Sequence, residues 1–302
     1  MKQLTIIRTF ILGLLLFTAV VANAQQEKVQ AAYVFLGQNK LDSAKANIDA
    51  AIIHPETVND AQAWLVRGYV YKSIYNAREK GNKRSPARLE GLYSFKKSLS
   101  LDTNKEYLPD NIGSIKFFAG SFHNDAAESL DPIDYRTAIE LFNKSQECYK
   151  IVDPSPASLQ AKQTEFDFAL VSVYNSVLEN DNKDSVKVFK FFTLAKNIYN
   201  KILALEPNNI QANVGMGKLY YNQAVNIIKS LDIDTDITKM DIIEENTKKL
   251  GTVAEPFMKT AHDLDPKRED AIIGLTGIYY ILHEDSKYNI FKQKLEDIKK
   301  PK

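Results

Sequence analysis

A helix, a short turn and a second helix recur along this chain at a regular spacing, and this recurrence constrains the fold more than any other feature. The clearest copy spans residues 194–220. Its first helix carries one face of residues three or four apart, Ala195, Tyr199 and Ile202. Pro207 ends that helix because proline cannot continue it. A second helix follows with its own shared face, Asn213, Met216, Gly217 and Tyr220.

This spacing resembles the tetratricopeptide repeat, a helix pair of about 34 residues whose pattern is W-x2-L-G-x2-Y, then A-x3-F, then P. Ala195-x3-Tyr199 with Pro207 matches the second helix of one unit, and Met216-Gly217-x2-Tyr220 matches the first helix of the next. Further copies are Ala44-x3-Ile48-x2-Ala51, Trp64-x2-Arg67-Gly68-x2-Tyr71, Phe95-x2-Ser98, Ala138-x3-Phe142, Ala254-x3-Met258-x2-Ala261 and Ile272-x2-Leu275-Thr276-x2-Tyr279.

The resemblance implies an all-α fold, a right-handed α-solenoid of about six antiparallel helix pairs from Glu27 to the C-terminus. Some positions depart from the family pattern, since Arg67 replaces a leucine and Thr276 replaces a glycine. Residues 160–174 fit the first-helix pattern poorly. Because each pair of a solenoid packs only on its neighbours, we expect one helical repeat domain over residues 25–302.

Residues 1–24 have the features of a secretory signal peptide. Lys2 and Arg8 precede an apolar run from Phe10 to Val21, and Ala22-Asn23-Ala24 supplies a small-x-small cleavage site. The apolar run is too short to span a bilayer comfortably. The sequence therefore predicts an exported chain, with an uncleaved membrane anchor as the alternative.

The charge and cysteine content exclude some functions. Removal of Lys2 and Arg8 leaves 37 of the 39 basic residues against 38 acidic ones, a net charge of −1. This balance removes the electrostatic case for nucleic acid, which needs a basic face. Cys148 is the only cysteine, so we expect no internal disulfide and no lipid attachment after the signal peptide. We expect Cys148 to be a buried, unreactive side chain.

Extra residues fall between the two helices of a unit in three places, Asn76–Pro86, Ser121–Tyr135 and Asn226–Leu250. We expect longer flanking helices there, and arms on one edge that either bind a partner or are surface loops. The first insertion is basic, with Arg78, Lys80, Lys83, Arg84 and Arg88. It could hold an anionic partner, although a solvated loop explains the same charges.

The third insertion contains Asp232-x-Asp234-x-Asp236, as some calcium loops do. Ile237 and Ile243 occupy the places where such a loop needs glycine and glutamate, so we expect helix capping or solvation instead. Asp241 precedes a helical run and is a candidate N-cap.

No catalytic, metal or cofactor motif stands out. The four histidines, His54, His123, His262 and His283, lie in different repeat units without metal-ligand spacing, and there is no phosphate-binding loop or nucleophile elbow. The sequence predicts a protein that is not an enzyme and needs no cofactor.

The resemblance also implies a concave groove lined by the first helices of the units. The residues expected to line it are Leu65, Tyr69 and Lys72, then Phe117 and Phe118, then Val214, Lys218, Tyr221 and Asn222, and finally Ile273 and Tyr280. This mixture of rings, aliphatic groups and charges suits an extended peptide or a partner helix. The alternative is that several of these rings pack against elongated neighbouring helices. The Lys/Asn clamp with which cytosolic members bind acidic chaperone tails is not evident.

We therefore expect a non-enzymatic protein-protein interaction scaffold, similar to envelope proteins of Bacteroidetes-type bacteria and located in the periplasm. The alternative is a glycan-binding helical-repeat protein of an outer-membrane uptake system, with Tyr220-Tyr221 and Tyr279-Tyr280 as aromatic platforms. Tyrosines clustered on one flat patch would favour sugar, and tyrosines along a groove would favour peptide. We also expect a close helix contact at Gly217, and a minor contribution of Tyr221 to stability.

Overall fold

The computed structural model describes residues 25–180, 184–232 and 235–299, and within these residues all regular structure is helical. The helices form sequential antiparallel pairs, as the sequence predicts: residues 25–37 with α2, α3 with α4, α5 with α6, α7 with α8, α9 with α10, and α11 with α12. The signal peptide predicted for residues 1–24 lies outside the described residues.

The chain divides into two compact units, and we describe each by itself. Among the described residues, the first comprises those up to Ser129 and Asp134–Ala161, and the second comprises Leu130–Ile133 and those from Lys162 onward. The helices of the first unit, after residues 25–37, are α2 (Leu41–Ala51), α3 (Ala61–Ile74), α4 (Pro86–Leu101), α5 (Leu108–Glu128) and α6 (Tyr135–Val152). A π-helix, η1 (Tyr75–Glu79), continues α3.

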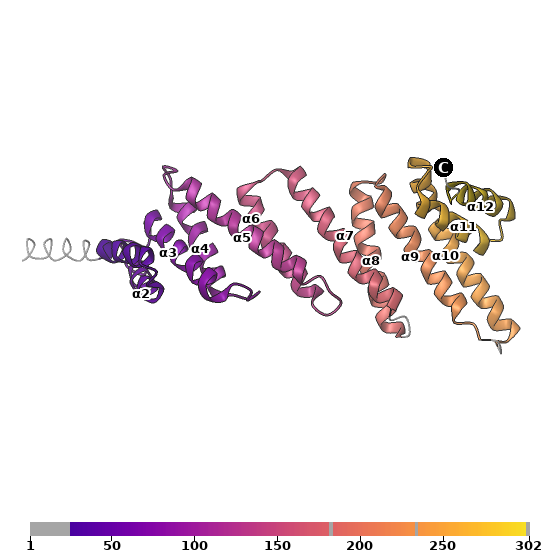
Figure 1. Ribbon diagram of the computed structural model, residues 1–302, viewed down its shortest axis with the longest axis horizontal. Coiled ribbons are helices and arrows are strands. Elements are labelled where there is room, and N and C mark those ends of the chain that lie inside the picture. The colour runs from indigo at the N-terminus through magenta and orange to yellow at the C-terminus, as the bar shows by residue number, and fades with distance from the viewer. Residues whose placement is uncertain (1–24, 181–183, 233–234, 300–302) are drawn as a thin grey trace, which may run out of the picture. The chain divides into compact units, whose positions relative to one another are not determined.

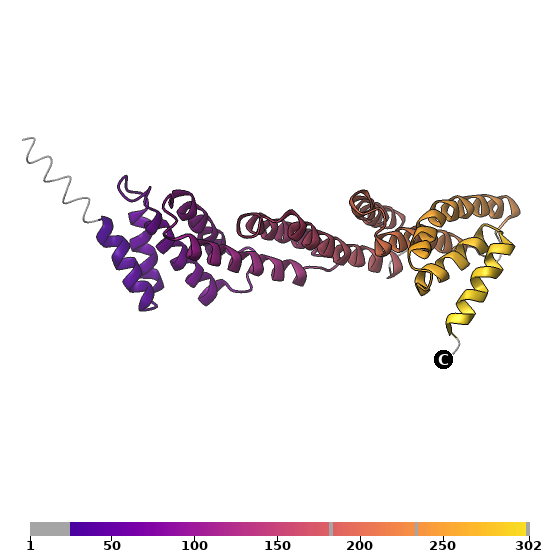
Figure 2. The same ribbon diagram turned by 90° about the horizontal axis from the view of Figure 1, so that it is seen from above.

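The second unit contains the part of α7 (Pro156–Asn180) beyond Ala161, and five further helices. These are α8 (Ser185–Leu205), α9 (Ile210–Lys229), α10 (Ile237–Leu264), α11 (Glu269–Ile281) and α12 (Asp285–Lys299). Figure 1 shows α9 and α10 side by side, and they are in extensive contact. In Figure 2, α12 is the yellow helix near the C-terminal end, and it packs on α11.

The helices begin and end where the local sequence provides a cap or a break. Asn209 accepts a hydrogen bond from the Ala212 amide at 3.0 Å and starts α9, while α8 ends two residues before Pro207. Asp236 caps α10 in the same way through the Lys239 amide at 2.9 Å. The prediction that Asp241 caps a helix is therefore wrong, because α10 begins four residues earlier and Asp241 lies inside it.

The predicted lengthening of helices at the insertions is confirmed. The second insertion extends α5 to Glu128, and the third extends α9 to Lys229 and moves the start of α10 back to Ile237. The first insertion forms η1 and a short connection to α4. Within the described residues, no helix is both long enough and apolar enough to cross a membrane.

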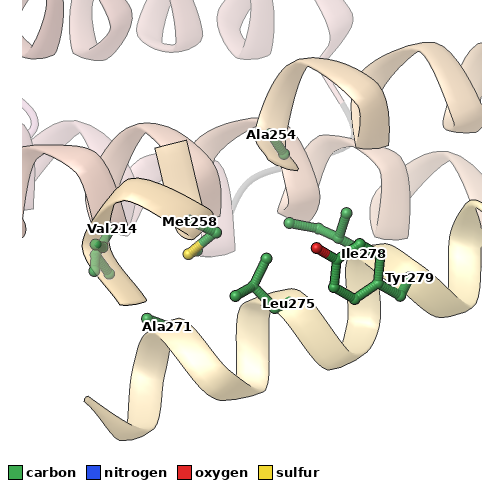
Figure 3. Close-up of a cluster of buried hydrophobic side chains, with 8 residues drawn as sticks. Val214, Ala254, Met258, Ala271, Leu275, Ile278 and Tyr279 are labelled. Carbon is green, nitrogen blue, oxygen red and sulfur yellow. The ribbon is translucent and has the colours of Figure 1, made fainter. Parts of the chain in front are cut away.

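Small residues allow the helices of a pair to approach closely. A β-carbon added to Gly68 on α3 would lie 2.7 Å from the Phe95 ring on α4. In the second unit Met258 on α10 packs against α9 and α11, and Figure 3 shows its side chain between Val214 and Leu275. These contacts explain why the repeated pattern places glycine and small residues at fixed positions.

Two arginines lie inside the first unit. Arg67, which replaces the leucine of the family pattern, bonds Asp49 at 2.9 Å and Glu90 at 2.8 Å. Arg88 is fully buried, bonds Asp125, and has its guanidinium 4.1 Å from the centre of the Phe122 ring. Arg88 therefore belongs to the core. The sequence analysis had assigned it to an exposed basic loop, and this assignment is wrong.

Candidate functional site

A row of side chains crosses from α3 to α5 in the first unit, and we call it the α3–α5 surface. Its partly exposed side chains are Tyr69 and Lys72 on α3, with Asp110, Phe117 and Ser121 on α5. The buried side chains of Tyr75 on η1 and Ser114 on α5 lie beneath them. The contacts follow both helices in the same direction. Tyr69 donates to Asp110 at 2.6 Å, Lys72 donates to Ser114 at 3.4 Å, and the Tyr75 and Ser121 hydroxyls are 2.6 Å apart. Equivalent positions of successive first helices therefore lie next to one another.

This arrangement combines an aromatic ring with charge. The Lys72 ammonium lies 4.6 Å from the centre of the Phe117 ring, a distance at which a cation is attracted to the ring face. Phe117 is 38% exposed, and its ring also meets Tyr75 edge-on at 6.4 Å. The surface thus combines an apolar ring with an ammonium group beside it, and it carries a carboxylate, Asp110, further along α5.

A cleft of about 530 Å³ continues the α3–α5 surface towards the ends of these helices. Phe117 and Tyr75 form one part of its wall, and the polar groups around it include Asn76, Lys80 and Asn124. A cleft of this size can hold a ligand or several side chains of a peptide.

The environment of the surface shifts the pKa values of two of its residues. Burial and, second, the hydrogen bond to Asp110 raise the pKa of the Tyr69 phenol to about 12. Burial lowers the pKa of the Lys72 ammonium from its usual value. Both side chains are half-buried, as expected of groups between two helices, and this burial is the main cause of both shifts.

The second unit has a separate cleft of about 300 Å³ with walls from α7, α8 and α9, which we call the α7–α9 cleft. Lys218 and Asn222 of α9 line it, opposite Asn175 and Glu179 of α7. Lys218 also lies 3.6 Å from Asp270 of α11. The structure therefore places these two predicted groove residues together at an open polar cleft.

Three residues expected in the groove are core residues instead. Leu65, Phe118 and Val214 are 7%, 0% and 3% exposed, so an open groove cannot be lined by them. A helix with neighbours on several sides buries more of its circumference than the usual amphipathic stripe.

Tyr221 is half-buried, and its ring packs onto Gly277 of α11, where an added β-carbon would lie 2.3 Å from the phenol oxygen. It contacts the core cluster of Figure 3, and this packing favours a larger contribution to stability than the sequence suggested. Ile273 and Tyr280 on α11 are exposed, at 44% and 68%.

The tyrosine pairs considered for sugar binding do not form flat platforms. Tyr279 is 4% exposed whereas Tyr280 is 68% exposed, because consecutive residues of a helix point in different directions. Tyr220 turns towards Phe192 of α8, with ring centres 5.3 Å apart, and its neighbour Tyr221 turns towards α11. Each pair is therefore divided between two environments.

The sequence analysis did not identify Tyr75, whose buried ring supports the α3–α5 surface, or Asn175 and Glu179 at the α7–α9 cleft. Tyr75 lies three residues after Lys72, and residues three apart share a face of a helix. Continuing the pattern of Tyr69 and Lys72 along the chain would have identified it. Asn175 and Glu179 lie on α7, whose poor fit to the family pattern gave no register for assigning a face.

Two basic side chains of the first insertion pair with acidic neighbours. Arg78 bonds both carboxylate oxygens of Asp42, at 2.7 and 3.0 Å, and Lys83 lies 3.2 Å from Asp134. This pairing weakens the case for an anionic partner there. Among the described residues, no group of three or more histidine, cysteine or acidic side chains is arranged to hold a metal ion. The Asp232-x-Asp234-x-Asp236 motif lies partly outside these residues.

Comparisons with known proteins give only remote similarity. No protein-family model matches the chain, and no curated protein matches its sequence. A tetratricopeptide repeat protein from Parabacteroides merdae ATCC 43184 is similar in structure, with 14% identity and a TM-score of 0.28 over 93% of this chain and 95% of that one. The human IFIT1 dimer with m7Gppp-AAAA has 15% identity and a TM-score of 0.30 over 88% of this chain. This chain covers 58% of the IFIT1 chain, and neither similarity carries an argument about function.

Proposed function

We propose that this protein is a non-enzymatic scaffold that binds an extended peptide or a helix of a partner protein on its first-helix faces. The observation that carries the proposal is the α3–α5 surface, where Tyr69, Lys72 and Phe117 adjoin a cleft of about 530 Å³. A row of groups that alternates ring, ammonium and hydroxyl over two parallel helices suits the alternating side chains of a peptide.

We further propose that residues 1–24 direct export and that the mature chain acts in the periplasm of a Gram-negative bacterium. The charged start, apolar run and Ala22-Asn23-Ala24 site support this proposal. Expression of the full chain with a C-terminal tag, followed by mass measurement and cell fractionation, tests it. An intact N-terminus in the cytoplasm would overturn it.

The binding proposal is tested with the mature chain as bait in an envelope extract, followed by reconstitution with the purified captured protein. Phe117→Ser and Lys72→Ser remove exposed or half-exposed groups of the surface, and we expect each to weaken binding about tenfold, as for an interface anchor. Ile133→Ser is the matched control, because Ile133 is 94% exposed and lies outside both clefts.

If all three variants bound the captured protein as tightly as the unmodified chain, the assignment of this surface would be overturned. Retention of the chain on envelope polysaccharide, with no protein captured, would replace the scaffold by the glycan-binding alternative.

A further inference from the structure

The second unit contains another depression, formed mainly by α8 and α9 with Leu250 of α10 at its edge, which we call the α8–α10 groove. Its volume is about 460 Å³. It is lined by α8, α9 and α10 and by no residue of α7 or α11, so it is distinct from the α7–α9 cleft. The two depressions share only the wall formed by Phe192, Gln223 and Asn226.

The groove follows its two main helices for about three turns. On α8 the lining residues run from Ser185 to Lys196, and on α9 from Tyr220 to Ser230. Eleven helical steps correspond to about 16 Å. A groove of that length between helices matches a short helix laid along it, which is a common way of binding a peptide.

The walls of the groove are mainly apolar and partly uncovered. Phe192 and Tyr220 meet edge-on at 5.3 Å at its floor, and Ile227 and Leu250 are half-buried beside them. Phe189 at the rim is 73% exposed. A large ring left in water beside an apolar depression is the kind of surface that a partner covers.

The two helices that form most of the groove carry positive charge only. Between Ser185 and Leu205, α8 has four lysines and no acidic residue, and between Ile210 and Lys229, α9 has two lysines and no acidic residue. Lys196 lines the groove, 6.0 Å from the centre of the Tyr220 ring.

Acidic residues near the groove are engaged locally. Asp184 caps α8 by accepting hydrogen bonds from the amides of Val186 and Lys187, at 3.0 and 3.1 Å. On α10, Glu245 pairs with Lys249 at 2.6 Å. Lys196 is the one charged side chain among the residues that line the groove, and it lies beside the apolar floor. Of the other lysines of α8, Lys201 is paired with Asp167 at 2.7 Å.

We propose that the α8–α10 groove binds an acidic amphipathic helix of about three turns from a partner protein, with its apolar face on Phe192 and Tyr220. Phe189 then covers one edge of the bound helix, and Lys196 faces its carboxylates. This site is separate from the α3–α5 surface, so the protein could hold two partners, or two segments of one partner, at once.

The test uses two labelled synthetic helices with the same leucine stripe at positions i, i+3, i+4 and i+7, one with glutamate and one with lysine at the remaining positions. Fluorescence anisotropy with the mature chain is expected to show binding of the acidic helix at least about tenfold tighter. Equal binding of both helices would overturn the charge recognition and with it the proposal.

Variants locate the binding. Phe189→Ser and Lys196→Glu are each expected to weaken the affinity for the acidic helix about tenfold. Ile290→Ser on α12 removes a side chain that is 56% exposed and lies outside the groove, and it is expected to leave this affinity unchanged. Circular dichroism identifies any variant that fails to fold. An unchanged affinity of a folded Phe189→Ser chain would overturn the proposal.

Two further measurements distinguish other occupants. Sedimentation of the chain alone would reveal a dimer, and a dimer abolished by Phe189→Ser would assign the groove to a second copy. Flotation with vesicles of anionic phosphatidylglycerol, if abolished by the same variant, would assign it to lipid. Either result would overturn the helix proposal, and a monomer that ignores the vesicles while binding the acidic helix supports it. An unchanged affinity of the Phe117→Ser variant would overturn only the α3–α5 surface, because Phe117 does not line the α8–α10 groove.

Discussion

Met258 lies directly against the backbone of Gly217, since a β-carbon added to that glycine would be 2.5 Å from Met258 Cγ. The other side of the same side chain meets Gly274, where an added β-carbon would be 2.6 Å from Met258 Cε. Met258 is fully buried and therefore joins α9, α10 and α11 through two glycines. The close contact expected at Gly217 from the sequence is confirmed.

Gly217→Leu is expected to destabilise the protein by about 1 to 3 kcal/mol, because Met258 cannot withdraw from Gly217 without moving onto Gly274. Urea unfolding measures the loss. Gly113→Ala on α5 is the control, since nothing lies within 4 Å of the β-carbon it adds, and alanine favours a helix over glycine by about 0.5 to 1 kcal/mol. A Gly217→Leu chain as stable as the parent would show that the helices separate there at no cost.

Removal of the Asp125 carboxylate is expected to destabilise the first unit by about 3 to 5 kcal/mol, because Arg88 would keep a buried charge without its partner. Asp125→Ala is the test, by thermal unfolding. The double variant Arg88→Met, Asp125→Leu should recover most of the loss, since an apolar pair does not need desolvated charges. Equal instability of the double and the single variant would contradict this account.

The sequence predicted the helix pairs because their spacing is local, and each pair repeats the same small and large residues. It did not predict which residues of a first helix face water. Leu65 and Tyr69 are one helical turn apart, yet Leu65 is buried and Tyr69 reaches Asp110 of another pair. That difference depends on how far neighbouring helices extend, which is set by contacts between segments distant in the sequence. The burial of Arg88 could not be predicted for the same reason, since its charge is balanced by Asp125 of the next helix pair.

Tyr221→Ala is expected to destabilise the second unit by about 1 to 3 kcal/mol, because the half-buried ring covers Gly277 and contacts the core around Met258. Tyr221→Phe keeps the ring and should change stability by less than about 0.5 kcal/mol. Chemical unfolding of both variants measures the difference. If Tyr221→Ala were as stable as the parent, the ring would not belong to this core.

Cys148 is expected to resist thiol reagents in the folded protein. Its side chain is fully buried, and burial raises the pKa of the thiol to about 11, so little of the reactive thiolate exists at neutral pH. Reaction with an aromatic disulfide reagent should be slow in buffer and fast in concentrated urea. Rapid labelling in buffer would show that the Cys148 region of α6 opens readily.

Ionisation of Tyr69 is expected to destabilise the folded chain between about pH 10 and about pH 12. Burial and then Asp110 raise its pKa from 10.0 to about 12, so the folded state holds the phenol proton more tightly than the unfolded state. The associated stabilisation is complete below pH 10 and is lost as the pH rises through the folded pKa.

The difference in absorbance at the phenolate band between the parent and Tyr69→Phe isolates this titration. Asp110→Asn should lower the Tyr69 pKa only part of the way to 10.0, since burial is the larger cause and remains in the variant. A midpoint near 10 in the parent would mean that Tyr69 faces open water and that the α3–α5 surface is not closed by its bond to Asp110.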